Sequence, residues 1–254
     1  TVVPLNQYNS SSMNPIAIVC GLKYNGGQVL GMGLYNSESE AWAHQTSIGC
    51  DLKFEGIGVN YSGSKDKGYI IEGDLDGFDN WDYICNIEPV DTTDSVRKYP
   101  VFYFANNYAK RAGLTETKYA ENWFVPSIDE LYNLYKNKDI IQKTLLKVGK
   151  FKLESVYWSS SHTIDDPLDV VLMDFDYDEI NDDDKYFEYN VLVLRAFNPK
   201  LLEMVKPKIE SVNLETSIVG KGYTGTIPIT ITGECLLNCD ITSEVILSDI
   251  SYIS

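Results

Sequence analysis

The start of a helix at Ser127 is the clearest structural signal in the chain. Ser127 is a preferred N-cap residue, and Glu130, three positions later, completes the capping-box pattern. Apolar residues then recur at helical spacing on one face: Ile128, Leu131, Leu134 and Tyr135. We therefore expect a helix from Ile128 that is buried along one side, followed by a second helix over 139–146.

Strand-like runs flank this helical region. The apolar segments 15–22 and 29–35 predict a hairpin around the turn at Asn25–Gly27, and Trp42 should enter the core. Further strands are expected over 156–159, 170–176 and 189–197. We expect the last two to be antiparallel neighbours, joined by an acidic loop over 177–185. With another helix over 100–111, the pattern predicts the α+β class.

The composition changes between Pro199 and Pro207. From Lys208 onward there is no Trp or Phe, and Ile227, Ile229 and Ile231 alternate with threonines. This predicts a first domain of residues 1–200, with a loose leader over 1–14, and a small all-β module over 206–254. The module has about 49 residues, whereas an immunoglobulin-like sandwich needs about 100. A partial immunoglobulin-like domain, a truncated repeat and a small β addition all remain open.

Charge and cysteine content exclude several classes of function. The net charge of −16 disfavours binding to nucleic acids and to anionic membrane surfaces. The sequence contains no run of 18 apolar residues, so we expect no membrane insertion. Five cysteines give no even disulfide framework, and with two histidines and no Cys-x-x-Cys pair a zinc site is disfavoured. We expect most of the cysteines to be small buried apolar residues: Cys20, Cys50, Cys85, Cys235 and Cys239.

Four landmarks occur in a fixed order along the chain. They are Asp74-Leu75-Asp76-Gly77, then Trp123-Phe124-Val125-Pro126-Ser127 with Glu130-Leu131, then Tyr157-Trp158-Ser159-Ser160-Ser161, then Arg195-Ala196-Phe197. Together they resemble a bacterial family of C-type-lectin-like domains that includes the C-terminal domain of a collagen-like adhesin. The resemblance covers about residues 15–197 and implies a fold with two helices and twisted antiparallel sheets.

The resemblance also implies an extracellular recognition role. The same fold is similar to that of formylglycine-generating enzymes, whose catalytic cysteine motif has no match here, and of retroelement variable proteins, whose ligand surface corresponds to 157–189. The adhesin binds glycosaminoglycans, but this region is acidic, so that ligand does not transfer. The expected ligand-binding residues are Asp174, Asp176, Tyr177, Asp178, Asp182, Tyr186 and Tyr189.

Two acidic clusters invite a cation. On one strand Asp174, Asp176 and Asp178 would share a face with Asp182–Asp184 nearby, which suggests a weak calcium or basic-ligand site. The EF-hand pattern fails at Glu179 and Lys185, so a solvated acidic face is the favoured interpretation and no cofactor is expected. The second cluster is expected to form Asx-turns or a helix cap: Asp74, Asp76 and Asp79.

Other chemistry-bearing residues have simpler interpretations. Trp123 and Trp158 are expected in the core, Ser159–Ser161 at a turn or strand edge, and His162 on the surface. A hydrolase built on Ser159–His162 and the carboxylate clusters is a third hypothesis, which is disfavoured because no positioned base is evident. The leading hypothesis is a non-catalytic secreted or cell-surface protein, adhesin-like, that binds a carbohydrate or protein. The alternative is a structural subunit that self-associates by strand addition through its β module.

Overall fold

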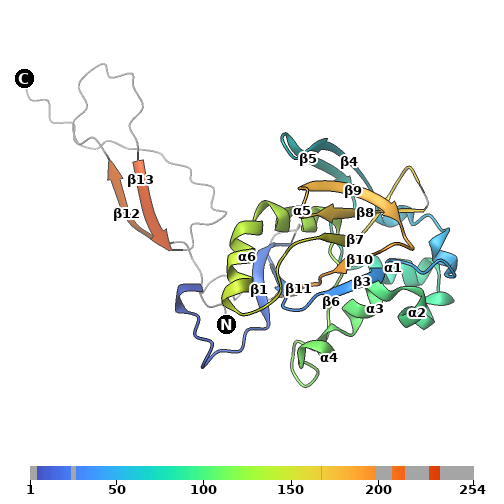
Figure 1. Cartoon of the computed structure of the whole chain (residues 1–254), viewed down its shortest axis with the longest axis horizontal. Coiled ribbons are helices and arrows are strands. Elements are labelled where there is room, and N and C mark those ends of the chain that lie inside the picture. The colour runs from blue at the N-terminus through green and yellow to red at the C-terminus, as the bar shows by residue number, and fades with distance from the viewer. Residues whose placement is uncertain (1–4, 24–26, 167, 198–207, 215–228, 235–254) are drawn as a thin grey trace, which may run out of the picture. The chain divides into compact units, whose positions relative to one another are not determined.

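A computed structural model describes residues 5–23, 27–166, 168–197, 208–214 and 229–234 of the chain (Figure 1). Internal contacts divide the chain into two units, Thr1–Leu201 and Leu202–Ser254. The first unit combines helices with two sheets, so its class is α+β, as the sequence predicts.

The described part of the first unit contains six α-helices, more than the two that the family resemblance implies. They are α1 (Asn80–Ile87), α2 (Ser95–Lys98), α3 (Pro100–Asn106), α4 (Tyr108–Ala112), α5 (Ile128–Lys136) and α6 (Lys138–Lys147). Short 3-10 turns lie at Leu5–Gln7, Ile48–Cys50, Glu55–Ile57 and Asp91–Asp94. The helix predicted over 100–111 is split at Asn107, whose side-chain amide donates to the carbonyl of Tyr103 at 3.0 Å. An asparagine that bonds the preceding turn in this way competes with helix propagation.

The smaller sheet has four antiparallel strands. Its order is β1 (Ala17–Leu22), β2 (Val29–Gly33), β11 (Leu194–Phe197) and β6 (Trp123–Phe124). The predicted β1–β2 hairpin is confirmed, with an irregular register between Val19 and Gly21. Gly31 allows β11 to approach closely, because a Cβ there would lie 2.5 Å from Cε2 of Phe197.

The larger sheet has seven strands and mixed directions. It contains β3 (Ser37–Ala41), β10 (Glu188–Val191), β7 (Val156–Thr163), β4 (Gly58–Ser64) and β5 (Gly68–Gly73), with β8 (Asp169–Asp174) on β7 and β9 (Glu179–Asp184) on β8. β7 runs parallel to β10 and β4, and the other pairs are antiparallel. The sheets are therefore not purely antiparallel, contrary to the expectation.

The prediction for the acidic segment is wrong. Residues 179–184 are not a loop but strand β9, which pairs in register with β8 from Asp174↔Glu179 to Asp169↔Asp184. β9 tolerates its aspartates because it pairs with β8 alone among the described residues, leaving its other edge in solvent. The segment 189–197 is two strands in two sheets, so β8 and β10 are separated by β7.

The helices cover the sheets on different sides. α5 and α6 pack beside β1, and α3 packs against β3 and β6 (Figure 1). Trp42, Trp123 and Trp158 are buried, which confirms their predicted place in the core. Cys20 and Cys50 are buried and Cys85 is half-buried, and all three are free thiols.

The second unit is described only in part. β12 (Lys208–Leu214) and β13 (Ile229–Glu234) form an antiparallel pair in which Ile231 lies opposite Val212. The alternation around Ile229 and Ile231 thus does form a strand. Several predicted features lie outside the described residues: leader residues 1–4, the turn residues Asn25 and Gly26, Cys235, Cys239 and most of 206–254.

Candidate recognition site

The end of β8 and the turn that follows it place four of the predicted site residues. β8 ends at Asp174, whose Oδ1 accepts the backbone N–H of Asp176 at 2.9 Å and of Tyr177 at 3.0 Å. Asp178 has a positive φ of 63° and forms an ion pair with Lys138. The expectation that Asp174, Asp176 and Asp178 share one strand face is wrong, because residues 175–178 turn. Asp174 and Asp178 stabilise this turn.

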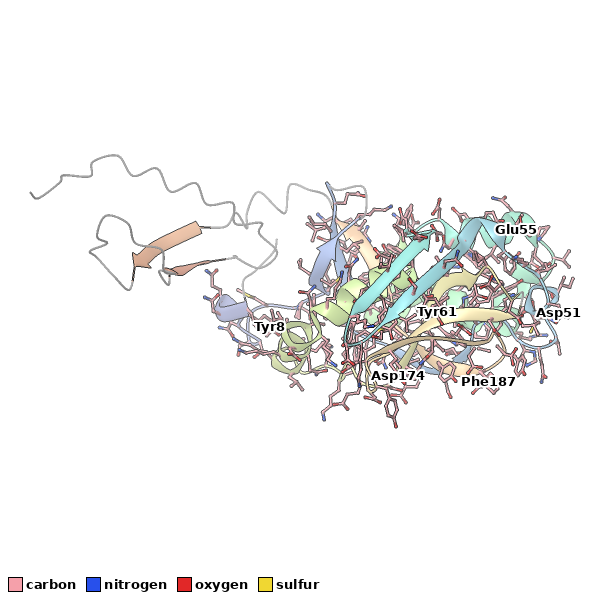
Figure 2. The ribbon with its side chains drawn as sticks, turned by 90° about the horizontal axis from the view of Figure 1, so that it is seen from above. Tyr8, Asp51, Glu55, Tyr61, Asp174 and Phe187 are labelled. Carbon is pink, nitrogen blue, oxygen red and sulfur yellow. The ribbon has the colours of Figure 1, made fainter. Side chains whose placement is uncertain are left out.

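The remaining predicted residues lie along the free edge of β9. We name this surface the acidic edge and define it by eight residues: Tyr61, Asp169, Asp182, Asp183, Asp184, Tyr186, Phe187 and Tyr189. Asp174 lies at the start of β9, opposite Glu179, and Phe187 lies beyond the end of β9 (Figure 2). Tyr61 lies on β4, which pairs with β5 and β7. Because side chains alternate along a strand, Asp182 and Asp184 share one side and Asp183 takes the other.

Each aspartate of β9 receives a tyrosine hydroxyl. Tyr61 donates to Asp182. Tyr186 donates to Asp184 at 2.7 Å. Tyr189 donates to Asp183 at 2.5 Å. Burial and the Asp183 carboxylate raise the pKa of Tyr189 to about 12, and burial with Asp182 raises the pKa of Tyr61. The three phenols therefore stay protonated and hold the carboxylates in place.

Like charges accumulate at Asp169, opposite the end of β9. Burial, followed by the charges of Asp166, Asp182 and Asp184, raises the pKa of Asp169 to about 6. This repulsion is relieved by an approaching cation. Within the described residues, however, no three His, Cys, Asp or Glu side chains are grouped so that they could hold a metal ion. The geometry suits spread positive charge, such as that of a basic polypeptide, better than chelation.

Aromatic rings are exposed beside this charge. Tyr186 and Phe187 are 43% and 44% exposed, and their ring centroids lie 5.0 Å apart. Tyr177, at the far turn, is 70% exposed. Tyr189 is only half-exposed because its ring packs edge-on against Trp158. Phe187 was missed from the sequence, although a phenylalanine inside an acidic, tyrosine-rich segment is a usable signal for a binding surface.

Lys185 fixes the backbone on which these rings stand. Its side chain is fully buried, and Nζ donates to the carbonyls of Gly49 at 3.1 Å and Cys50 at 3.4 Å and to that of Leu52. Burial lowers the pKa of this amine to about 8. The one lysine in the acidic segment is thus structural, and it turns the neighbouring Tyr186 and Phe187 outward.

The serine and histidine residues of β7 are interior, contrary to the expectation of a turn, a strand edge and a surface histidine. Ser159 Oγ donates to the Val171 carbonyl at 2.6 Å, and Ser161 Oγ accepts the Ile128 N–H at 2.9 Å. His162 is fully buried against Phe54. The cause is topological, since β7 has neighbours on both edges.

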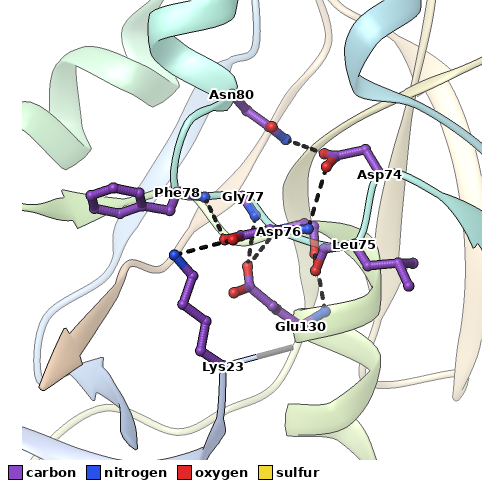
Figure 3. Close-up of polar contacts among 9 residues, drawn as sticks. Lys23, Asp74, Leu75, Asp76, Gly77, Phe78, Asn80 and Glu130 are labelled. Atoms are coloured by element: carbon purple, nitrogen blue, oxygen red, sulfur yellow. Dashed lines mark hydrogen bonds and ion pairs between the residues drawn. The ribbon is translucent and has the colours of Figure 1, made fainter. Parts of the chain in front are cut away.

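Asp74 and Asp76, from the second acidic cluster, belong to a partly buried polar network around Glu130 (Figure 3). Asp74 and Asp76 form the expected Asx-turns, accepting the N–H of Asp76 and Phe78 respectively. Asp76 also pairs with Lys23 at 3.1 Å, while Asp79 makes no side-chain cap on α1. These aspartates therefore order the loop before α1.

The capping box completes the same network. Glu130 Oε2 accepts the N–H of Ser127 at 2.9 Å and of Gly77 at 3.1 Å (Figure 3). Burial raises the pKa of Glu130 to about 8. The predicted capping box is confirmed, and it has a long-range partner that the local pattern did not reveal.

No protein-family model matches the sequence, and no curated protein matches it either. A solved structure of a fimbrial protein from Bacteroides ovatus ATCC 8483 is similar, with 15% identity and a TM-score of 0.48. The similarity covers 72% of this chain and 44% of that chain, so the chain spans less than half of that protein's length. Among the described residues, no helix has the length and apolar character needed to span a membrane.

Proposed function

We propose that the chain is a non-catalytic recognition protein, secreted or displayed on a bacterial cell surface, that binds a lysine- or arginine-bearing protein through the acidic edge. The observation that carries the proposal is the row of three aspartates on β9, each held by a tyrosine hydroxyl. Fixed carboxylates beside the exposed rings of Tyr186 and Phe187 offer both charge and apolar area to a partner.

A C-type-lectin-like fold belongs to the same proposal. Its support is that the four sequence landmarks meet in space. Glu130 bonds the N–H of Gly77, the Ser160 N–H donates to the Pro126 carbonyl at 2.7 Å, and Arg195 on β11 lies opposite Trp123 on β6. Residues that join distant segments in this way define a fold rather than a binding site.

The absence of catalysis is also part of the proposal. The hydroxyls of Ser159 and Ser161 already take part in hydrogen bonds that join β7 to β8 and to α5. A nucleophile needs a free approach to its substrate, and these serines are fully buried.

Binding measurements on the full chain test the function. Biolayer interferometry would compare a panel of purified surface proteins, a lysine-rich peptide and its counterpart with glutamine at each lysine. The test variant is Asp182→Asn/Asp184→Asn, and the matched control is Glu116→Gln/Glu121→Gln, which removes two exposed charges elsewhere. We expect the test variant to lose roughly tenfold or more in affinity and the control little, with weaker binding at high salt. Equal binding by both variants would overturn the proposal.

A second candidate function is a structural role in a surface assembly. It is favoured by β12 and β13, which among the described residues pair only with each other. A two-stranded sheet is marginally stable alone and gains from an added strand. Sedimentation of the full chain over a range of concentrations, with and without residues 206–254, tests this role. Oligomers that require 206–254 support it, and a monomer at every concentration contradicts it.

A further inference from the structure

A hollow lies where β3 and β10 meet the segment that precedes β7. Its volume is about 450 Å³, within the range of about 300–1,000 Å³ that is usual for small-ligand sites. Its lining residues include Asn36, Glu38, Ser39, Phe151, Glu154 and Asn190. Of the acidic edge, Tyr189 alone takes part in this lining.

The wall formed by β3 is shaped by an irregular strand pair. β10 residue Tyr189 lies opposite Glu40 and Val191 lies opposite Ser37, so Glu38 and Ser39 face the single residue Asn190. An extra residue of this kind bends the strand and redirects its side chains, and such bulges are frequent beside binding sites. Here it leaves Glu38 and Ser39 exposed at the hollow.

The backbone is constrained on both sides of the hollow. Ser39 has a φ of 61° and Ser155 a φ of 85°, in the left-handed region that non-glycine residues rarely occupy. Asn122 and Asp178 are the other non-glycine residues with positive φ in the described chain, and neither lines this hollow. Two serines with constrained backbones therefore line the same pocket.

A largely buried tyrosine forms part of the pocket wall. Tyr157 is 1% exposed and lines the hollow, and its ring packs edge-on against Phe175. Burial, with the nearby charges of Asp176, Glu38 and Glu154, raises the pKa of its phenol, and no hydrogen bond from a described residue contributes. The Tyr157 phenol therefore supplies a neutral hydrogen-bonding group at the wall of the pocket.

The chemistry of the lining selects a ligand class. Two carboxamides, Asn36 and Asn190, and the Tyr157 phenol are neutral hydrogen-bonding groups, and Phe151 and Tyr189 add ring surface. One lysine and three glutamates give the lining a net charge of −2: Lys152, Glu38, Glu154 and Glu188. Anionic ligands are therefore repelled. Vicinal hydroxyls match the carboxylate and carboxamide groups, and the C–H face of a pyranose matches the rings.

We propose that this pocket binds an uncharged sugar unit of a glycan. The site shares only Tyr189 with the protein-binding acidic edge. The two sites would allow one molecule to hold a glycan and a basic protein together.

Saturation-transfer NMR on the full chain tests the proposal. The probes are glucose, galactose, mannose, N-acetylglucosamine and their β-linked disaccharides, compared with glucuronic acid, N-acetylneuraminic acid and a lysine peptide. We expect transfer to at least one neutral sugar at about 10 mM and none to the acids. The high concentration is needed because single sugars bind with weak affinity. Silence of all neutral sugars, or transfer to the acidic sugars equal to that of the neutral ones, would overturn the proposal.

Two variants test the location of the sugar site, and two others are controls on the acidic edge. Tyr157→Phe removes one oxygen, and Asn190→Ala removes one carboxamide; each should weaken sugar binding roughly tenfold with no loss of thermal stability for Tyr157→Phe. Tyr186→Phe, on the acidic edge, is the matched control and should bind the sugar as the wild type does. Unchanged affinity in Tyr157→Phe and Asn190→Ala would refute the pocket. Asp182→Asn/Asp184→Asn should keep sugar binding, which separates this result from the test of the acidic edge.

Discussion

Glu130 accepts a hydrogen bond from the backbone N–H of Gly77, 53 residues earlier in the chain, at 3.1 Å. The same oxygen caps the first turn of α5 through the Ser127 N–H. One buried carboxyl thus links a helix start to the loop before α1. Its other oxygen, Oε1, has no hydrogen-bond partner among the described residues. This arrangement makes the fold sensitive to the charge of Glu130 and to the size of residue 77.

Glu130→Gln should flatten the pH dependence of stability. The folded pKa of Glu130 is about 8 and its unfolded value is near 4.5, so the folded state binds the proton more tightly. The stability it contributes is complete below about pH 4.5 and is lost as pH rises through 8. Glutamine keeps the acceptor without the charge, so we expect the variant to exceed wild type at pH 8 by roughly 2 kcal/mol.

Urea unfolding at pH 5 and pH 8 measures this effect. Asp169 titrates in the same direction, so the difference between variant and wild type, rather than the wild-type slope, isolates Glu130. Glu116→Gln, which changes an exposed carboxyl, is the control. A variant less stable than wild type at pH 8 would contradict the prediction.

Gly77→Ala should strongly destabilise the first unit. A Cβ at position 77 would lie 2.4 Å from the Val125 carbonyl oxygen and 2.5 Å from the Ser127 nitrogen, both backbone atoms that cannot easily move. The loop would have to withdraw and lose its bond to Glu130, at a cost of about 3 kcal/mol or more. Gly21→Ala is the matched control, because no atom lies within 4 Å of a Cβ built there. Denaturant midpoints of the two variants provide the comparison, and equal midpoints would count against it.

Lys185 should make the protein more stable as pH rises from 8 toward 10. Its folded pKa is about 8, below the ordinary value of 10.5, so in that window the unfolded state binds more protons and is penalised as pH rises. Lys185→Met should remove this rise. At pH 7 it should also cost about 3 kcal/mol, because the carbonyls of Gly49 and Leu52 lose their donor. Unfolding followed from pH 7 to 10 checks both, and a wild-type stability that only falls would refute the first.

Asp169→Asn should weaken peptide binding at the acidic edge and slightly raise the stability of the fold. The raised pKa of Asp169 means that its charge is unfavourable in the folded state above about pH 6. Much of this group is in solvent, so the variant should gain only a few tenths of a kcal/mol at pH 7.5, and added salt should erase the gain. The same change should weaken binding of a lysine-rich peptide at the acidic edge. Calorimetric unfolding and interferometry on one preparation measure both, and a gain in binding would oppose the proposed role of this charge.

Local sequence determined much of the first unit. The capping box at Ser127 and Glu130 fixed the start of α5, because its hydrogen bonds lie within four residues. Apolar runs set the β1–β2 hairpin, and large aromatic area placed Trp42, Trp123 and Trp158 inside. These features depend on neighbours in the chain or on burial preference alone, and both can be read from the order of residues.

The tertiary structure decided which surfaces became sites. Whether 179–184 is a loop or a strand depends on pairing with β8, and the burial of His162 depends on β7 receiving neighbours on both edges. The pocket needs β3, β10 and the segment before Tyr157 to meet, which no local pattern encodes. Sequence periodicity indicates the secondary structure that a segment adopts and the face that it buries. The neighbours of that segment come from contacts between distant parts of the chain, and these contacts position the carboxylates and hydroxyls of the proposed sites.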